Sequence, residues 1–267
     1  MQKRLLVALL SVFILTACSQ SPNPSPSSEN TPLSEDMTEG VQNLREVWKA
    51  QLPEPLYTRE QDEPTSRDFS QPALKTGVEG KSVVLTFDDG PSPYTEEILD
   101  ILQEKNVYAT FCVIGSQVEQ YPDVLRRIVV DGHELCNHSM HHRMDMYSWS
   151  TASVVYDLEL VDEAIADIVG EEYKPVYYRA PGGMFGGNTS SALEEIGMRP
   201  VYWSVDPRDW SEPGVDAIIE NVLTNIEPQG IVLLHDGGGN REQTIAALPE
   251  IIDALIEEGY EFAPLRP

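Results

Sequence analysis

Short apolar runs alternate with amphipathic segments from about residue 77 onward, and this alternation restricts the chain to few folds. The run 83–87 is apolar and rich in β-branched residues, which is typical of a fully buried strand. The segment 93–103 that follows it places its apolar residues on one helical face. The same order of strand and helix then repeats along the chain. Repeated strand–helix units predict a parallel sheet covered by helices.

Seven strands and six helices are expected in this part of the chain. The expected strands are 83–87, 109–114, 133–136, 176–179, 199–205, 230–235 and 260–264, and the expected helices are 93–103, 122–130, 150–169, 189–196, 214–225 and 242–258. Seven parallel strands would nearly close a barrel, so we predict an α/β fold with the helices outside. In such barrels the chemistry lies on the loops that follow the carboxyl ends of the strands.

The N-terminus has the features of a secretion signal. Lys3 and Arg4 precede an apolar run at 5–15, which is shorter than the roughly 20 residues that span a bilayer. The run leads into Leu-Thr-Ala-Cys, ending at Cys18, which resembles the bacterial lipobox, where the signal is cut before the cysteine and the thiol is lipidated. We therefore expect a signal peptide at 1–17 and an extracytoplasmic protein anchored to the bacterial cell membrane. The alternative is an ordinary signal peptide with a buried or reactive cysteine.

A tether is expected between the anchor and the folded domain, over 18–76. In the segment 19–32, 11 of 14 residues are Ser, Pro or Asn, a composition that cannot form a core. The segment 36–52 has apolar residues near helical spacing, which predicts a short helix, and 53–76 is a polar, proline-containing linker. A single folded domain over 77–267 follows.

Charge and cysteine content exclude several classes of protein. With 44 acidic and 18 basic residues the formal charge is −26, which argues against a nucleic-acid partner. Three cysteines are too few for a disulfide-stapled mini-domain or a four-cysteine zinc ribbon. Cys112 and Cys136 lie in two expected neighbouring strands. Buried free thiols are the favoured state of this pair, and a disulfide is the alternative.

Candidate metal ligands follow the first and third expected strands. Asp88 and Asp89 are adjacent at a strand end, where two carboxylates repel unless a cation or proton lies between them, although a single aspartate there is often a helix N-cap. His138 and His142 are four residues apart, a spacing that can grip one metal ion. A weaker pair is His138 with His141, and a solvated polar loop is the alternative. Two histidines and one carboxylate suit catalytic zinc or non-haem Fe(II).

Polar side chains also follow the later strands. They are Arg179 before the turn 180–183, Asp206 and Asp209 before Trp210, and His235 at the end of an apolar run. The turn offers backbone N–H groups to an oxyanion. Each feature alone is more often structural than catalytic. Polar groups at five successive strand ends are difficult to explain by packing.

This set, in this order, resembles the polysaccharide deacetylases of carbohydrate esterase family four, which share the chitooligosaccharide deacetylase homology domain. The resemblance covers about residues 80–267. The matching motifs are Thr-Phe-Asp-Asp-Gly at 86–90, the histidines at 138 and 142, Arg-x-Pro-x-Gly at 179–183, Asp-x-x-Asp-Trp at 206–210 and Leu-Leu-His-Asp at 233–236. The resemblance implies a distorted (β/α) barrel of about seven parallel strands.

The resemblance also implies a role for each site residue. Asp89, His138 and His142 would bind the metal, Asp88 would be the general base held ionised by Arg179, His235 would be the general acid paired with Asp209, and Trp210 would line the acetyl pocket. Pro181 and Gly182 would contact substrate and oxyanion. Gly182 stands where the family often has Tyr or Phe, so its backbone N–H remains available but the aromatic shelf is absent.

The expected function is metal-dependent removal of acetyl groups from N-acetylglucosamine units of an extracellular polysaccharide, peptidoglycan or chitin-like. Asp88 would deprotonate the attacking water, and His235 would protonate the leaving amine. One divalent ion is expected, with zinc favoured over cobalt or another metal. The alternatives are an O-acetyl esterase on acetylxylan-like polymers and a non-catalytic sugar-binding lipoprotein. An Fe(II) oxygenase would share only the three ligands. The expected partners are the polysaccharide and the membrane.

Overall fold

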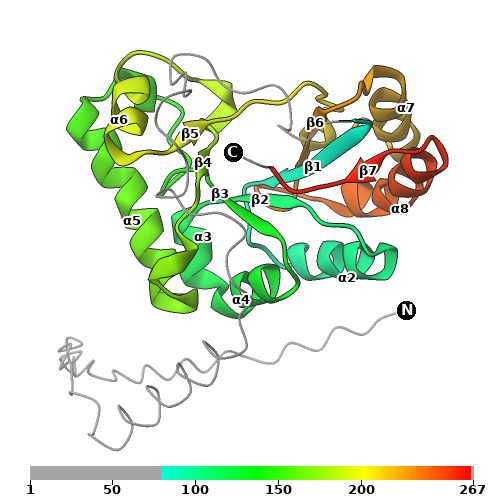
Figure 1. The fold of residues 1–267 in the computed structure, drawn as a ribbon, viewed down its shortest axis with the longest axis horizontal. Helices are drawn as coiled ribbons and strands as arrows, with labels where there is room; N and C mark the ends of the chain where they lie inside the picture. Colours follow the sequence, from blue (N-terminus) through cyan, green and yellow to red (C-terminus); the bar gives the residue numbers. More distant parts are fainter. Residues whose placement is uncertain (1–79, 266–267) are drawn as a thin grey trace, which may run out of the picture. The chain divides into compact units, whose positions relative to one another are not determined.

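The structure is a computed structural model that describes residues 80–265, in which a seven-stranded sheet is surrounded by helices (Figure 1). The strands are β1 (Ser82–Asp88), β2 (Thr110–Val113), β3 (Glu134–Asn137), β4 (Tyr177–Tyr178), β5 (Arg199–Pro200), β6 (Gly230–His235) and β7 (Glu261–Phe262). The helices are α2 (Thr95–Lys105), α3 (Gly115–Gln120), α4 (Pro122–Val130), α5 (Thr151–Val169), α6 (Asn188–Ile196), α7 (Val215–Asn225) and α8 (Glu242–Glu257). Every strand pairing is parallel, and the strand order is β5-β4-β3-β2-β1-β6, with β7 beside β1. The predicted α/β fold is confirmed.

Strand β1 is the centre of the sheet. All seven of its residues are buried, and it pairs with β6 along six residues, from Val83 opposite Gly230 to Asp88 opposite His235. Its other side pairs with β7 at the amino end and with β2 at the carboxyl end. The register places the carboxylate at the end of β1 level with the imidazole at the end of β6.

The chain that follows β5 closes the sheet into a distorted barrel. Only Arg199 and Pro200 pair with β4, so the strand expected over 199–205 is shorter than predicted. Val205 then forms an isolated bridge with Val232 of β6, and the backbone N–H of Leu233 donates to the Val205 carbonyl at 2.9 Å. The segment 199–205 therefore contains β5, at one end of the strand order, and contacts β6, at the other end.

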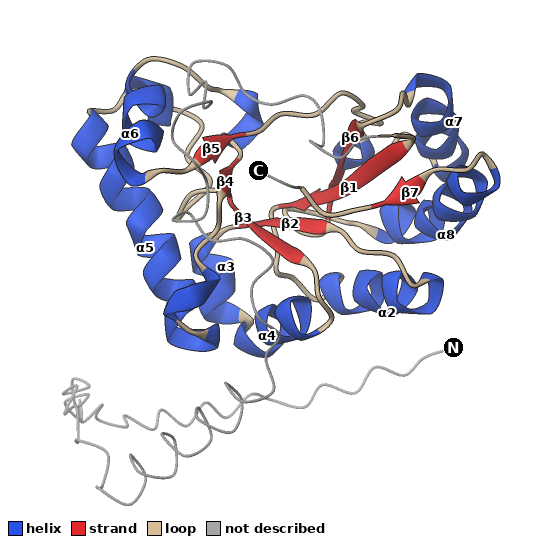
Figure 2. Ribbon diagram, in the orientation of Figure 1, coloured by secondary structure: helices blue, strands red, loops and turns tan. Residues whose placement is uncertain are grey.

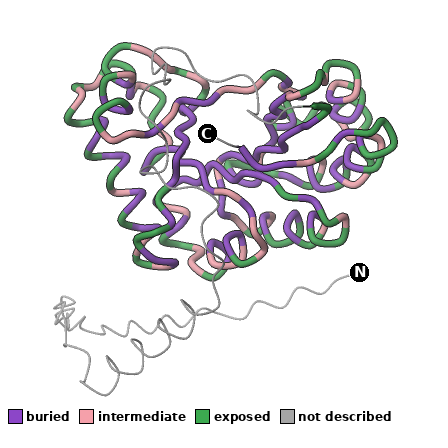
Figure 3. Tube along the Cα trace, in the orientation of Figure 1, coloured by how far each residue is buried: buried purple, intermediate pink, exposed green. Residues whose placement is uncertain are grey.

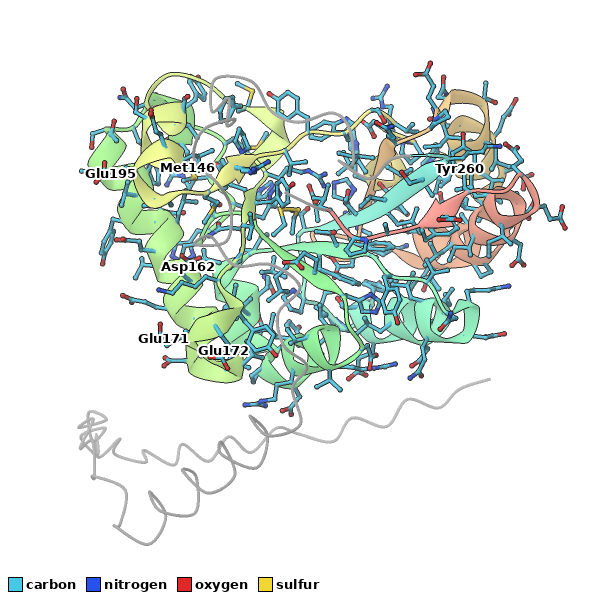
Figure 4. All side chains as sticks on the ribbon, in the orientation of Figure 1. Met146, Asp162, Glu171, Glu172, Glu195 and Tyr260 are labelled. Carbon is cyan, nitrogen blue, oxygen red and sulfur yellow. A yellow bond between two sulfur atoms is a disulfide. The ribbon has the colours of Figure 1, made fainter. Side chains whose placement is uncertain are left out.

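The helices cover the outside of the sheet (Figure 2). They form two apolar clusters with it. The larger cluster joins β1, β2 and β6 to the buried faces of the surrounding helices, and the strands are almost continuously buried (Figure 3). In the smaller one, Met146, labelled in Figure 4, packs with Leu158 of α5, Tyr178 of β4 and Leu193 of α6. None of the helices within 80–265 is long and apolar enough to cross a membrane.

Helix α3 was not expected from the sequence. Its six residues contain one aliphatic side chain, Val118, so no apolar stripe marks it. All six expected helices and all seven expected strands are present, with most ends within two residues of the predicted ones. The signal peptide, Cys18, the tether over 18–76 and its short helix lie outside the described residues.

The favoured interpretation of Cys112 and Cys136 as free thiols is wrong, because the structure joins them in a disulfide. The parallel register of β2 and β3 sets these two residues directly opposite each other, with their Cα atoms 4.1 Å apart. Strand register cannot be read from one sequence, so this pairing could not be settled there.

Candidate active site

The proposed metal ligands converge at the carboxyl ends of β1 and β3. Asp89 Oδ1 lies 3.2 Å from Nε2 of His142 and 3.4 Å from Nε2 of His138. The ligand atoms of these three residues all lie within 4.8 Å of one another. Asp89 and His142 have left-handed backbone conformations, which turn the chain sharply after β1 and in the loop after β3. His141 is exposed and lies outside this group.

The environment of this group suits a cation. Asp89 Oδ1 is buried and has no hydrogen-bond partner. Burial alone would raise the pKa of the Asp89 carboxyl, but electrostatic attraction to the neighbouring His138 and His142 rings holds it below its usual range. Nδ1 of His138 is 2.8 Å from the Arg179 carbonyl, which can only accept, so Nδ1 carries the proton and Nε2 keeps its lone pair. Two imidazole nitrogens and a carboxylate oxygen are typical zinc ligands.

Asp88 lies beside this group and is held by a buried arginine. Nη1 of Arg179 donates to Asp88 Oδ1 and to Thr86 Oγ1, each at 2.7 Å, and Nη2 donates to the Tyr202 carbonyl at 3.0 Å. Arg179 is completely buried, so its interaction with the carboxylate is poorly screened by water. The other oxygen of Asp88 lies 3.7 Å from Nε2 of His138.

His235, the last residue of β6, forms a second pair with Asp209. Its Nδ1 is 2.7 Å from Asp209 Oδ1, while the other oxygen of Asp209 accepts from the His235 backbone N–H and from the Thr244 hydroxyl at 2.9 and 2.8 Å. Burial alone would lower the pKa of His235, but the hydrogen bond and charge of Asp209 raise it. The ring is therefore suited to carry a proton near neutral pH.

One open cavity of about 480 Å³ is lined by Asp88, Asp89, His138, His142 and His235, while Arg179 and Asp209 lie behind its lining. Gly182 and Trp210 line it, whereas Pro181 is buried in the turn before Gly182 and is not a lining residue. Sequence reasoning missed Met144, Trp203 and Arg241, which also line the cavity. Met144 lies in the loop that follows β3, and Arg241 lies between β6 and α8. Their positions after strand ends were therefore the only signal for them in the sequence.

Comparison with known proteins places these residues in a family. The family model for polysaccharide deacetylase matches residues 75–201. A chitooligosaccharide deacetylase from Sinorhizobium fredii is 39% identical over 204 residues, which cover 72% of this chain and 94% of the relative.

Two solved structures have the same fold. The Bc1960 peptidoglycan N-acetylglucosamine deacetylase superposes with a TM-score of 0.68 at 32% identity, covering 72% of this chain and 89% of that one. BA3943, a pseudoenzyme of carbohydrate esterase family four from Bacillus anthracis, superposes with a TM-score of 0.67 at 27% identity, covering 77% and 69%. Identity above one third along nearly the whole of the rhizobial relative, together with the shared barrel, shows that the chain belongs to the polysaccharide deacetylase family.

Proposed function

We propose that this protein hydrolyses the acetyl group of N-acetylglucosamine units in an extracellular polysaccharide, peptidoglycan or a chitin-like polymer. One observation carries the proposal: a carboxylate held by a buried arginine and an imidazole held by a carboxylate face the same cavity as a group of metal-ligating side chains. A sugar-binding protein has no need of such an arrangement. The BA3943 pseudoenzyme has a similar fold, so these side chains, and not the barrel, support catalysis.

Asp89, His138 and His142 would hold one divalent ion, and we propose zinc, with cobalt or another divalent metal as the alternative. The unpartnered oxygen of Asp89 and the fixed proton on Nδ1 of His138 fit this role. Such an ion, when bound, polarises a carbonyl oxygen and lowers the pKa of water.

Asp88 is the proposed general base. Arg179 donates to one of its oxygens, which leaves the other oxygen to take a proton from the attacking water. His235 is the proposed general acid. Because Asp209 holds Nδ1, the remaining ring nitrogen is the one that protonates the departing amine. The backbone N–H of Gly182 is the proposed donor to the tetrahedral oxyanion. Acetate and a free amino sugar result.

Measuring released acetate tests this proposal. The purified domain would be assayed on chitooligosaccharides, peptidoglycan and acetylxylan, after chelation and after zinc is restored. We expect acetate from an N-acetylglucosamine polymer, loss with the chelator and recovery with zinc. Release from acetylxylan alone would favour the O-acetyl esterase, and no release from any zinc-loaded sample would favour the non-catalytic sugar-binding protein.

We also propose that lipidated Cys18 anchors the protein on the outer side of the cell membrane, with 18–76 as tether and 77–267 as the catalytic domain. The basic pair, the apolar run and the lipobox-like Leu-Thr-Ala-Cys support this arrangement. Fractionation of cells that express Cys18→Ala tests it. We expect the variant to leave the membrane fraction, and an equal membrane share for wild type and variant would contradict the anchor.

A further inference from the structure

Met144 occupies the space of a side chain at position 182. Gly182 has φ 58 and ψ 19, a left-handed conformation. A Cβ atom built there would lie 2.7 Å from Sδ of Met144 and even closer to its terminal methyl group, nearer than non-bonded atoms approach. The thioether therefore fills the position that a Cβ atom would take, and no side chain larger than hydrogen fits at 182 unless Met144 moves.

The place of Met144 in the cavity suggests contact with substrate. It follows the metal-ligand candidate His142 by two residues, lines the cavity and is 51% exposed. The side chains of its neighbours Arg143 and Asp145 are joined to each other by two hydrogen bonds of 3.0 and 2.8 Å. An exposed apolar side chain thus lines the same cavity as the metal-ligand candidates.

We propose that Met144 is the apolar shelf on which the sugar ring that carries the acetyl group rests. This inference depends on the proposed deacetylase function. If the acetyl oxygen binds at the backbone N–H of Gly182, the attached sugar lies against whatever covers Gly182, and that is the Met144 thioether. The C–H groups of a pyranose ring bury well against an apolar surface, and an unbranched thioether adapts its shape to such a ligand. Met144 is thus a specificity-determining residue, and it comes from the loop after β3 that also carries His142.

Kinetics of Met144→Ala test the shelf. We expect KM for a chitooligosaccharide to rise about tenfold with kcat nearly constant, since roughly two buried methylene equivalents are lost. The ratio of kcat/KM for the oligosaccharide to that for 4-nitrophenyl acetate, which has no sugar, should fall about tenfold. Met144→Leu, which keeps an apolar side chain of similar size, should have a KM close to that of the wild type. An unchanged KM, or equal losses on both substrates, would overturn the proposal.

Met184→Ala is the matched control, because Met184 is 44% exposed and lies near the same glycine but does not line the cavity. We expect wild-type kinetics from it. Circular dichroism and thermal midpoints would show that each variant is folded. Inactivity of the zinc-loaded wild type on every substrate would refute the deacetylase function itself, whereas an active wild type with a silent Met144→Ala would refute only the shelf.

A double-mutant cycle tests the packing that underlies the inference. Gly182→Ala should lower kcat/KM for the oligosaccharide because its new methyl group displaces Met144. In a Met144→Ala background the same substitution should cost several-fold less, since the space is free, while the cost of the left-handed backbone is common to both. Independent effects of the two substitutions would show that Met144 does not fill the space above Gly182.

Discussion

Strand β3 has a buried histidine at each end, His133 before its first residue and His138 after its last. Nδ1 of His133 accepts the backbone N–H of Ala109, its Nε2 has no partner, and the rings of Phe111 and Tyr108 lie edge-on to it. His138 instead faces two carboxylates.

The two rings have opposite pKa shifts. Burial, aided by the nearby charge of Arg127, lowers the pKa of His133 to about 4. Burial acts in the same direction on His138, but the charges of Asp88 and Asp89 outweigh it and raise the pKa. Burial alone therefore favours a neutral histidine, whereas two carboxylates beside a buried ring favour its protonated form.

The largest expected effect in this comparison comes from removing a metal-ligand candidate. His138→Ala or His142→Ala should abolish metal binding and lower kcat/KM by about a thousandfold or more, since an ion that polarises the carbonyl contributes several kcal/mol. His133→Asn, which keeps a hydrogen-bond acceptor for Ala109, should retain metal. Elemental analysis and acetate release measure both properties. Normal metal content in both alanine variants would place the site elsewhere.

Substitution within the aspartate pair separates base from ligand. Asp88→Asn should keep the metal and lose roughly a hundredfold or more in turnover, because general-base help is lost while Asp89 is untouched. Asp89→Asn should instead weaken metal binding. Metal titration alongside kcat distinguishes the two variants. The reverse pattern, with weak metal in Asp88→Asn and intact metal in Asp89→Asn, would exchange their roles.

His235 extends the comparison to a third buried ring. His235→Ala should lower kcat/KM for a chitooligosaccharide more than for 4-nitrophenyl acetate, since an amine needs a proton to leave whereas a phenolate of low pKa does not. Asp209→Asn should give the same bias in milder form, because it acts through the ring. If both substrates lose equally, His235 is not the leaving-group acid.

The smallest effect concerns stability at the other end of β3. The unfolded chain protonates His133 near pH 6.5 while the native state resists protonation until about pH 4, so the native state loses stability as pH falls through this window. The loss between pH 8 and pH 5 is on the order of 2 kcal/mol. Denaturant unfolding at both pH values should show that the free energy of unfolding of His133→Asn changes less with pH than that of the wild type, by this amount. Parallel curves would mean that the ring titrates normally.

Most of the fold and the polar part of the site were predictable, because both depend on patterns local in the chain. The apolar run of β1 marks a buried strand, and Asp88 and Asp89 follow it directly. What failed depends on contacts between distant segments. The bridge from Val205 to Val232, the disulfide and the packing of Met144 on Gly182 each require a register or a loop path that no local pattern encodes.

The central position of β1 bears on how the domain opens. β1 is completely buried and is hydrogen-bonded to strands on both sides. Its amides therefore reach solvent only through global unfolding, and they should be among the slowest to exchange with deuterium. The carboxylate proposed as base is the last residue of that strand. Partial opening of the outer helices would thus leave Asp88 in place while it disturbs the proposed site residues that come from loops.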